Sequence, residues 1–212
     1  MEKSKKLFVI GKRPTRTMII VTAVLAIIAG LEAGFYLCKL CKVEDYKISA
    51  PIVILATAAI FFLIYVPTIA NCIKHWDISE KYIELYRVNK YGTQWKYVYG
   101  ILIGKEEKFA DKIELSEIKS IKLYWTTMFS YMVMMMHPIF FRVTLKDGTV
   151  IKFLSLVTSN DKNYVAAVKH LKEKCNIEIE DEHDLLSVIE DPNRSLNEYI
   201  DEIERASVKA KR

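Results

Sequence analysis

The chain lacks the short motifs by which nucleotide-binding proteins and the common hydrolases are recognised. Its 212 residues contain no P-loop, no G-x-G-x-x-G, no H-E-x-x-H and no G-x-S-x-G pattern. The four histidines are scattered, and no serine or carboxylate forms a recognisable pair of nucleophile and base. We therefore expect no catalytic residue and no cofactor, and an enzyme remains only as an alternative.

Cysteine is scarce as well, which removes the usual framework of a metal centre. Cys38 and Cys41 form one C-x-x-C, but no second such pair and no pair of histidines completes a zinc set. A small disulfide and half of a metal site remain open for this pair. We interpret the cysteines as structurally neutral and expect no metal.

Formal charge is almost absent from two long runs near the N-terminus. Residues 17–38 and 50–70 are apolar apart from Glu32. Each run is long enough, at about 1.5 Å per residue, to cross a hydrocarbon core of roughly 30 Å. The first run is too long for a cleaved signal peptide, and the second follows at once. The sequence thus predicts a transmembrane helical hairpin over residues 17–71.

Lysine and arginine are distributed unevenly around these runs. The net charge of +5 hides a basic arm, residues 1–16, and an acidic stretch, residues 178–204. The basic arm predicts a cell-membrane protein with two spans and with both termini cytosolic. It also points to membrane lipids as partners rather than to nucleic acid. The residues expected to contact anionic lipid are Lys5, Lys6, Lys12, Arg13 and Arg16.

Small residues recur at four-residue steps in the first run and share one helix face. Ala26, Gly30 and Gly34 would let a second helix approach closely, as in a G-x-x-x-G packing motif. Glu32 lies between the glycines, and an ionisable group in a span is a candidate functional residue. Snorkelling or protonation, pairing with a partner helix, and transport chemistry are all open for it.

From Trp76 onward the apolar residues recur with a period of two, which is typical of half-buried strands. Such patterns cover residues 82–88, 113–125, 141–145 and 149–154, and Lys146-Asp147-Gly148 predicts a hairpin turn between the last two. Helical spacing follows over residues 163–174, after a group of N-cap residues. These patterns predict an α+β domain over residues 72–180.

Residues 78–83, 113–121 and 141–148, with the helix 163–174, form loose patterns that cover about half of the chain. In these patterns the chain resembles membrane-anchored bacterial pleckstrin-homology-like (PH-like) proteins. The resemblance implies an antiparallel β-barrel or sandwich capped by a C-terminal helix, used for interaction and not for chemistry. It does not imply phosphoinositide binding, because Arg87, Lys90 and Lys96 lack the tight clustering that grips inositol phosphates. We expect residues 86–96 to form a solvated loop.

Residues 128–140 are rich in methionine and carry no formal charge. Methionine is flexible and polarisable, and it is favoured at adaptable apolar surfaces. A buried strand, a loop that dips into the bilayer, and a docking surface for another subunit are all open. The residues expected to contact a partner or the membrane are Met128, Met132, Met134, Met135, Met136 and Phe140.

The acidic tail, residues 181–212, contains a second amphipathic pattern that begins at a capping box of Ser195 and Glu198. A helix this short needs a surface to cover its apolar stripe. Packing on its own domain, fraying, and docking to a partner are open. The stripe, which we include among the candidate partner-binding residues, consists of Leu196, Tyr199, Ile200 and Ile203.

Together these features predict a non-enzymatic, membrane-anchored adaptor or accessory subunit. Its cytosolic domain would bind another membrane protein, or its own copies in a homo-oligomer. The alternative is an anionic-lipid-binding membrane module, in which the basic arm is attracted to headgroups and the methionine-rich segment inserts.

Overall fold

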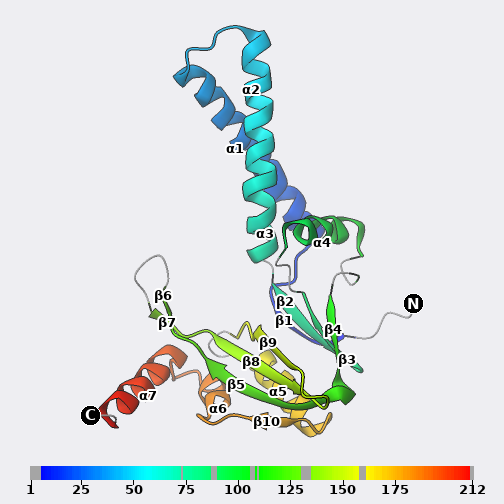
Figure 1. The fold of residues 1–212 in the computed structure, drawn as a ribbon, viewed down its shortest axis with the longest axis vertical. Helices are drawn as coiled ribbons and strands as arrows, with labels where there is room; N and C mark the ends of the chain where they lie inside the picture. Colours follow the sequence, from blue (N-terminus) through cyan, green and yellow to red (C-terminus); the bar gives the residue numbers. More distant parts are fainter. Residues whose placement is uncertain are drawn as a thin grey trace. The chain divides into compact units, whose positions relative to one another are not determined.

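The computed structural model describes residues 6–72, 74–86, 90–105, 108, 110–129, 135–157 and 161–210. The chain forms two compact units (Figure 1). The helical unit comprises Lys12–Lys74 and Tyr86–Asp111, and the α+β unit comprises Met1–Gly11, His75–Leu85 and Lys112–Arg212. Each unit packs around its own cluster of buried apolar side chains.

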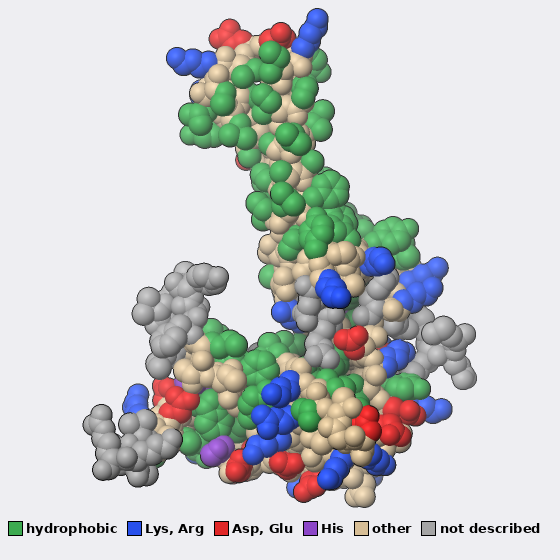
Figure 2. Space-filling model, in the orientation of Figure 1, with side chains coloured by type: hydrophobic (Ala, Val, Ile, Leu, Met, Phe, Trp, Pro, Cys, Tyr) green, Lys and Arg blue, Asp and Glu red, His purple; other side chains and the backbone are tan. Residues whose placement is uncertain are grey.

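Two long apolar helices form the hairpin of the helical unit. The first is α1 (Arg16–Leu40), and the second consists of α2 (Tyr46–Ala59), the π-helical segment η1 (Ile60–Tyr65) and α3 (Val66–Cys72). Both are long and apolar enough to span a membrane. Figure 2 shows apolar side chains along the hairpin and charged side chains at its tip, where α1 is joined to α2.

A third helix, α4 (Tyr91–Ile103), lies across the base of the hairpin and packs on α1 and α3 (Figure 1). It ends at Gly104, whose φ of 70° provides a left-handed C-cap. Its inner face joins the buried cluster through Tyr97, Val98 and Ile101. The expectation of a solvated loop over residues 86–96 is therefore wrong from Tyr91 onward. This segment is helical because its apolar face packs on α1 and α3.

The α+β unit contains two four-stranded sheets. The first has the order β1-β2-β3-β4, formed by β1 (Lys6–Gly11), β2 (His75–Ser79), β3 (Tyr82–Leu85) and β4 (Asp111–Glu114). The second has the order β10-β5-β8-β9, formed by β5 (Ile118–Trp125), β8 (Ile139–Leu145), β9 (Val150–Leu154) and β10 (Glu178–Glu180). β10 joins β5 in parallel, whereas β5, β8 and β9 pair antiparallel.

Shorter elements connect these strands. The 3-10 helix η3 (Leu115–Glu117) links β4 to β5, and a small ribbon of β6 (Met128–Phe129) and β7 (Met135–Met136) lies between β5 and β8. The predicted hairpin turn joins β8 to β9, where the amide of Thr149 donates to Oδ1 of Asp147 at 2.8 Å and Gly148 has a φ of 86°. The turn thus has an aspartate whose side chain accepts a backbone hydrogen bond and a glycine that adopts the positive φ without steric cost.

One core joins the two sheets and the helix α5 (Lys162–Glu173). Trp76 of the first sheet makes edge contacts with Phe141 and Phe153 of the second and with Tyr164 of α5. The indole Nε1 of Trp76 also donates to the carbonyl oxygen of Ser155 at 2.8 Å. The helices α6 (Leu185–Glu190) and α7 (Leu196–Ala210) complete the unit and contribute buried side chains to the same core.

The coarse prediction of fold class is confirmed, since the chain is α+β with a hairpin of two apolar helices. In the described residues the strands do not close into a barrel, so the barrel form of the prediction is wrong. The basic arm is also shorter than predicted. Residues Lys6–Gly11 form strand β1, which pairs with β2 after the hairpin, because their apolar side chains have a sheet to cover.

Candidate functional site

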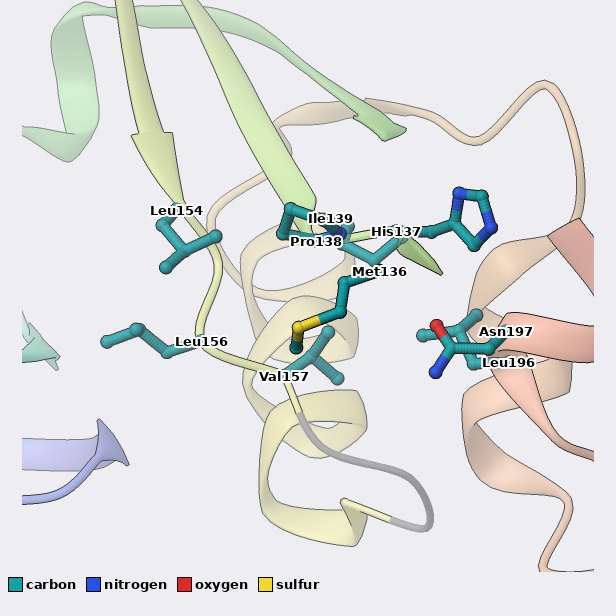
Figure 3. Close-up of a pocket in the computed structure, with 9 residues that line it drawn as sticks. All are labelled: Met136, His137, Pro138, Ile139, Leu154, Leu156, Val157, Leu196 and Asn197. Carbon is teal, nitrogen blue, oxygen red and sulfur yellow. The ribbon is translucent and has the colours of Figure 1, made fainter. Parts of the chain in front are cut away.

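A cleft of about 460 Å³ opens in the α+β unit where the chain after β9, the segment between β7 and β8, and the start of α7 meet. Figure 3 shows the Met136 side chain extending toward Val157, with Leu196 and Asn197 on the opposite wall. The imidazole of His137 points away from the space. We call this space the α7 cleft; it is lined by Met136, His137, Pro138, Ile139, Leu154, Leu156, Val157, Leu196 and Asn197.

The wall that follows β9 is shaped by an unusual backbone conformation. Leu156 has a φ of 58°, in the left-handed region that a leucine occupies at a cost of about 1–2 kcal/mol. In a regular strand adjacent side chains point to opposite faces. The bend at Leu156 lets both Leu156 and its neighbour Val157 face the cleft.

The cleft collects part of the predicted methionine surface. Met136 is 51% exposed at its rim, and Met128 on the paired strand β6 is exposed as well. Phe140 is half-buried and stacks on Tyr124 within the sheet, so it contributes to strand packing. Met132 and Met134 lie outside the described residues, as does the side chain of Met135.

The apolar stripe of the tail packs mostly on its own domain. Ile200 is completely buried in the core, so the prediction that it contacts a partner is wrong, because the domain itself covers it. Leu196 is buried at the wall of the α7 cleft. Tyr199 packs against the core and donates its hydroxyl to the carbonyl of His183 at 3.1 Å, while Ile203 is half-buried.

A polar network fastens α7 to the strands beside the cleft. The Nε2 atom of His137 lies 2.8 Å from Oδ1 of Asp201, and its Nδ1 atom lies 3.3 Å from the hydroxyl of Thr127. That hydroxyl donates to Oε1 of Glu204 at 2.7 Å, and the indole of Trp125 donates to the same oxygen at 3.0 Å. Asp201 and Glu204 are three residues apart and therefore share one face of α7.

The donors and acceptors of this network restrict the positions of its protons. Because Thr127 gives its single proton to Glu204, its oxygen is left to accept a proton from Nδ1 of His137. The contact of 2.8 Å between Nε2 of His137 and Oδ1 of Asp201 in turn requires a proton on one of these two atoms. The hydrogen bonds from Thr127 and Trp125 lower the pKa of Glu204, and His137 adds to this effect. The side chain of His137 is 1% exposed, so its position favours a structural role in holding α7 over contact with a substrate.

The small residues of α1 lie against the second helix of the hairpin. A Cβ atom on Gly30 would lie 2.7 Å from Cα of Thr57, and one on Gly34 would lie 2.7 Å from Cα of Val53. Ala26 packs against the cluster at the base of the hairpin. The Glu32 side chain is exposed on the outer side of α1, and in the described part of the chain no hydrogen bond or ion pair engages it.

The basic residues of the predicted arm have separate roles. The ammonium of Lys6 pairs with the fully buried carboxylate of Asp77, so the predicted lipid contact of Lys6 is wrong, because β1 carries this side chain into the sheet. Arg16 donates from Nε to the carbonyl of Ile101 in α4 at 3.4 Å. Lys12 and Arg13 are exposed. Lys5 and Arg87 lie outside the described residues, whereas Lys90 and Lys96 are exposed.

Nothing in the sequence indicated the network around His137. Asp201 and Glu204 have the spacing of a shared helix face, but nothing local indicates that His137 and Thr127 meet them across the fold. Within the described ranges no group of three His, Cys, Asp or Glu side chains is arranged to hold a metal ion. All four cysteines are free, with Cys38 buried and Cys41 exposed.

No protein-family model, curated protein or solved structure matches this chain. The resemblance to PH-like proteins therefore stays a prediction, and function has to be argued from the geometry of the two units.

Proposed function

We propose that the protein is a non-enzymatic, membrane-anchored adaptor or accessory subunit that binds an apolar segment of another membrane protein, or of a second copy, in the α7 cleft. The hairpin would hold the α+β unit at the inner face of a cell membrane. The observation that carries the proposal is the cleft, because residues far apart in the sequence line one open apolar space there.

The strand beside the cleft suits an extended partner segment. β9 is the last strand of its sheet in the order β10-β5-β8-β9. An edge strand offers backbone donors and acceptors to an added strand, and neighbouring pockets then select its side chains. β9 runs directly into Leu154 and Leu156 on the wall of the cleft, so an added strand and a side-chain pocket would be continuous.

The rest of the cleft lining combines a flexible side chain, Met136, with a helix, α7, that is held in position by hydrogen bonds. Met136 is exposed and flexible, which suits partner side chains of different shape. The start of α7 is held by the network of Asp201 and Glu204 one to two turns further along the helix. A partner that fills the cleft would therefore meet a fixed helix and a movable methionine.

A photoreactive amino acid at Met136 tests the proposal in native membranes. We expect irradiation to join the chain to one membrane protein, or to a second copy, that mass spectrometry identifies. The matched control is the same substitution at Val150, which is 48% exposed against 51% for Met136 but lies at the other end of β9. Equal products at both positions, or products with lipid alone, would contradict the proposal.

A charge in the cleft provides the second arm. Leu156→Asp should weaken the crosslink at Met136 about tenfold or more, because an apolar partner would have to desolvate the carboxylate. Aspartate tolerates the left-handed φ at this position better than leucine does. Because Leu156 also packs against the core, the loss is assigned to the cleft only if circular dichroism of the variant matches that of the parent chain. An undiminished crosslink would place the partner elsewhere.

Membrane anchoring is tested separately, by extraction of membranes at alkaline pH. We expect the protein to stay with the bilayer, since two helices of this length and hydropathy resist extraction. The alternative function in anionic-lipid binding by the basic arm is less favoured, because Lys6 is committed to Asp77.

A further inference from the structure

A second cavity, of about 260 Å³, lies in the helical unit between α4 and the base of the hairpin. It is lined by Ile20 and Ala23 of α1, Phe61 of η1, and Trp95, Tyr99 and Leu102 of α4. Its lining consists of aliphatic and aromatic side chains. The space is below the roughly 300–1,000 Å³ of pockets for drug-sized ligands, so it suits a narrow apolar chain.

The groove is built on rigid elements. Trp95 packs on the rings of Phe61 and Phe62, with centroids 6.1 and 4.8 Å away. The hydroxyl of Tyr91 donates to the carbonyl of Phe62 at 2.8 Å, which ties the start of α4 to the π-helical segment. The other end of α4 is closed by Gly104 and held by Arg16. The groove is therefore present before any ligand arrives.

The rim of the groove is apolar and exposed. Tyr99 is 61% exposed and Ile20 is 54% exposed, and Val24 and Leu25 on the next turn of α1 are exposed as well. Exposed apolar surface that is continuous with a pair of membrane-length helices is matched by lipid and not by water. Aromatic side chains such as Tyr91, Trp95 and Tyr99 are typical of the interfacial layer of a bilayer.

A positive charge stands at one end of this groove. Arg16 lies one turn before Ile20 on α1, and its Nε atom reaches Ile101, the residue before Leu102 of the groove wall. Its side chain is exposed, and a guanidinium has five donors, of which this contact uses one. The remaining donors are suited to a phosphate oxygen, for which arginine offers a planar fork.

We propose that this groove binds one acyl chain of an anionic phospholipid of the inner leaflet, with Arg16 at the lipid phosphate. The inference rests on the membrane anchoring of the proposed function, but it assigns a different site, because the α7 cleft belongs to the other unit. The lipid would fill the space between α4 and α1 and hold α4 in the interfacial layer.

Trp95 supplies the measurement, because it lines the groove. The full-length protein in detergent is titrated with phosphatidylglycerol whose acyl chains carry bromine, which quenches indole fluorescence on contact. Subtracting the signal of Trp95→Phe isolates Trp95 from Trp76 and Trp125. We expect quenching that saturates at about one lipid per chain, and a dissociation constant at least about tenfold weaker for brominated phosphatidylcholine.

Two substitutions of the same kind separate the groove from the general apolar surface. Ala23→Phe fills the groove and should abolish the saturable quenching. Ala29→Phe places the same ring on an exposed position of α1 and should leave it unchanged. Quenching that rises without saturation, or equally in both variants, would show contact with bulk lipid or detergent and overturn the proposal.

Arg16→Gln keeps the groove and tests the headgroup contact. We expect it to weaken phosphatidylglycerol about tenfold and phosphatidylcholine less, because the positive charge of choline already offsets the attraction between Arg16 and the phosphate. If Ala23→Phe loses its helical circular dichroism, this comparison decides alone, and equal affinities for both lipids in the parent chain and the variant overturn the proposal. A chain that resists alkaline extraction but shows no saturable quenching refutes the groove and leaves the anchoring intact.

Discussion

The core of the α+β unit and the helix contact at Gly30 and Gly34 in the hairpin bury different kinds of residue. The α+β unit buries large apolar side chains such as Trp76 and Phe141, and it pairs the charges that its sheets carry inward. The hairpin instead buries the glycines of α1 against the second helix, while Ile54 and Leu55 are about 70% exposed. In the α+β unit water is excluded from the apolar residues, whereas in the hairpin the apolar residues form the outside.

The difference shows which forces hold each unit. Burial of apolar area stabilises a domain in water, but it would contribute little between these helices if lipid surrounds them. Close approach and hydrogen bonds must then do this work. Gly30 and Gly34 supply the close approach, and the hydroxyl of Tyr65 donates to the carbonyl of Ile19 at 2.8 Å.

The largest effect is expected from removing the ammonium group that pairs with the buried carboxylate of the first sheet. Lys6→Met leaves the carboxylate of Asp77 in the sheet without its ammonium, and breaking a buried pair in this way costs about 3–5 kcal/mol. Thermal unfolding in detergent, followed by tryptophan fluorescence, measures the loss. Lys119→Met, at an exposed position of β5, should change stability by no more than about 0.5 kcal/mol. Equal effects of the two substitutions would mean that the pair is not what holds β1.

A smaller effect is expected in the hairpin, from a residue that adds apolar volume. Gly34→Val forces its Cβ atom against the backbone of Val53 and should destabilise the pair of helices by about 1–3 kcal/mol. Ala29→Val adds the same kind of side chain on the outside of α1 and should be neutral. Crosslinking of cysteine pairs across the hairpin before and after mild denaturation reports helix separation. A neutral Gly34→Val would show that close approach of the two helices at this glycine does not stabilise the hairpin.

The smallest effect is a dependence on pH at α7. Because the folded-state pKa of Glu204 lies below its ordinary value of 4.5, its hydrogen bonds stabilise docking of α7 above that pH. This stabilisation, about 1 kcal/mol for a partly exposed carboxylate, is lost as the pH falls through the lowered pKa. Hydrogen exchange in α7 should therefore rise below about pH 4.5, and Glu204→Gln should remove this part of the rise. An identical acid response in the variant would assign the effect to other carboxylates.

The elements that were predictable from the sequence are those whose signals are local. The turn at Asp147 and Gly148, the amphipathic face of α5, and the capping residue Ser195 ahead of α7 each lie within a few residues of the structure they specify. The same is true of the two apolar helices, whose length and hydropathy suffice. For these elements periodicity and capping agree with the fold.

α4 and β1 were not predictable because their partners are distant. Tyr91–Ile103 contains two glycines, a threonine and several tyrosines, which are poor helix formers, and it becomes helical by packing on α1 and α3. Lys6–Gly11 lies within the basic N-terminal segment. It forms a strand because it pairs with β2, which follows in the sequence only after the whole hairpin. The network of His137 was missed for the same reason, since Thr127, His137 and Asp201 meet only in the folded domain.

The pairing of β1 with β2 has a consequence for how the chain enters a membrane. Gly11 and His75 are cross-strand neighbours, so the chain leaves the first sheet and returns to it at the same place. Two points that touch lie on one side of any bilayer, and the segment between them must cross it an even number of times. The pairing of β1 with β2 thus restricts the membrane topologies that the chain can adopt. If the hairpin spans a membrane, an arrangement with one span, or with the two termini on opposite sides, would require separating β1 from β2. Strand β1 would then stay unpaired until both helices have been inserted.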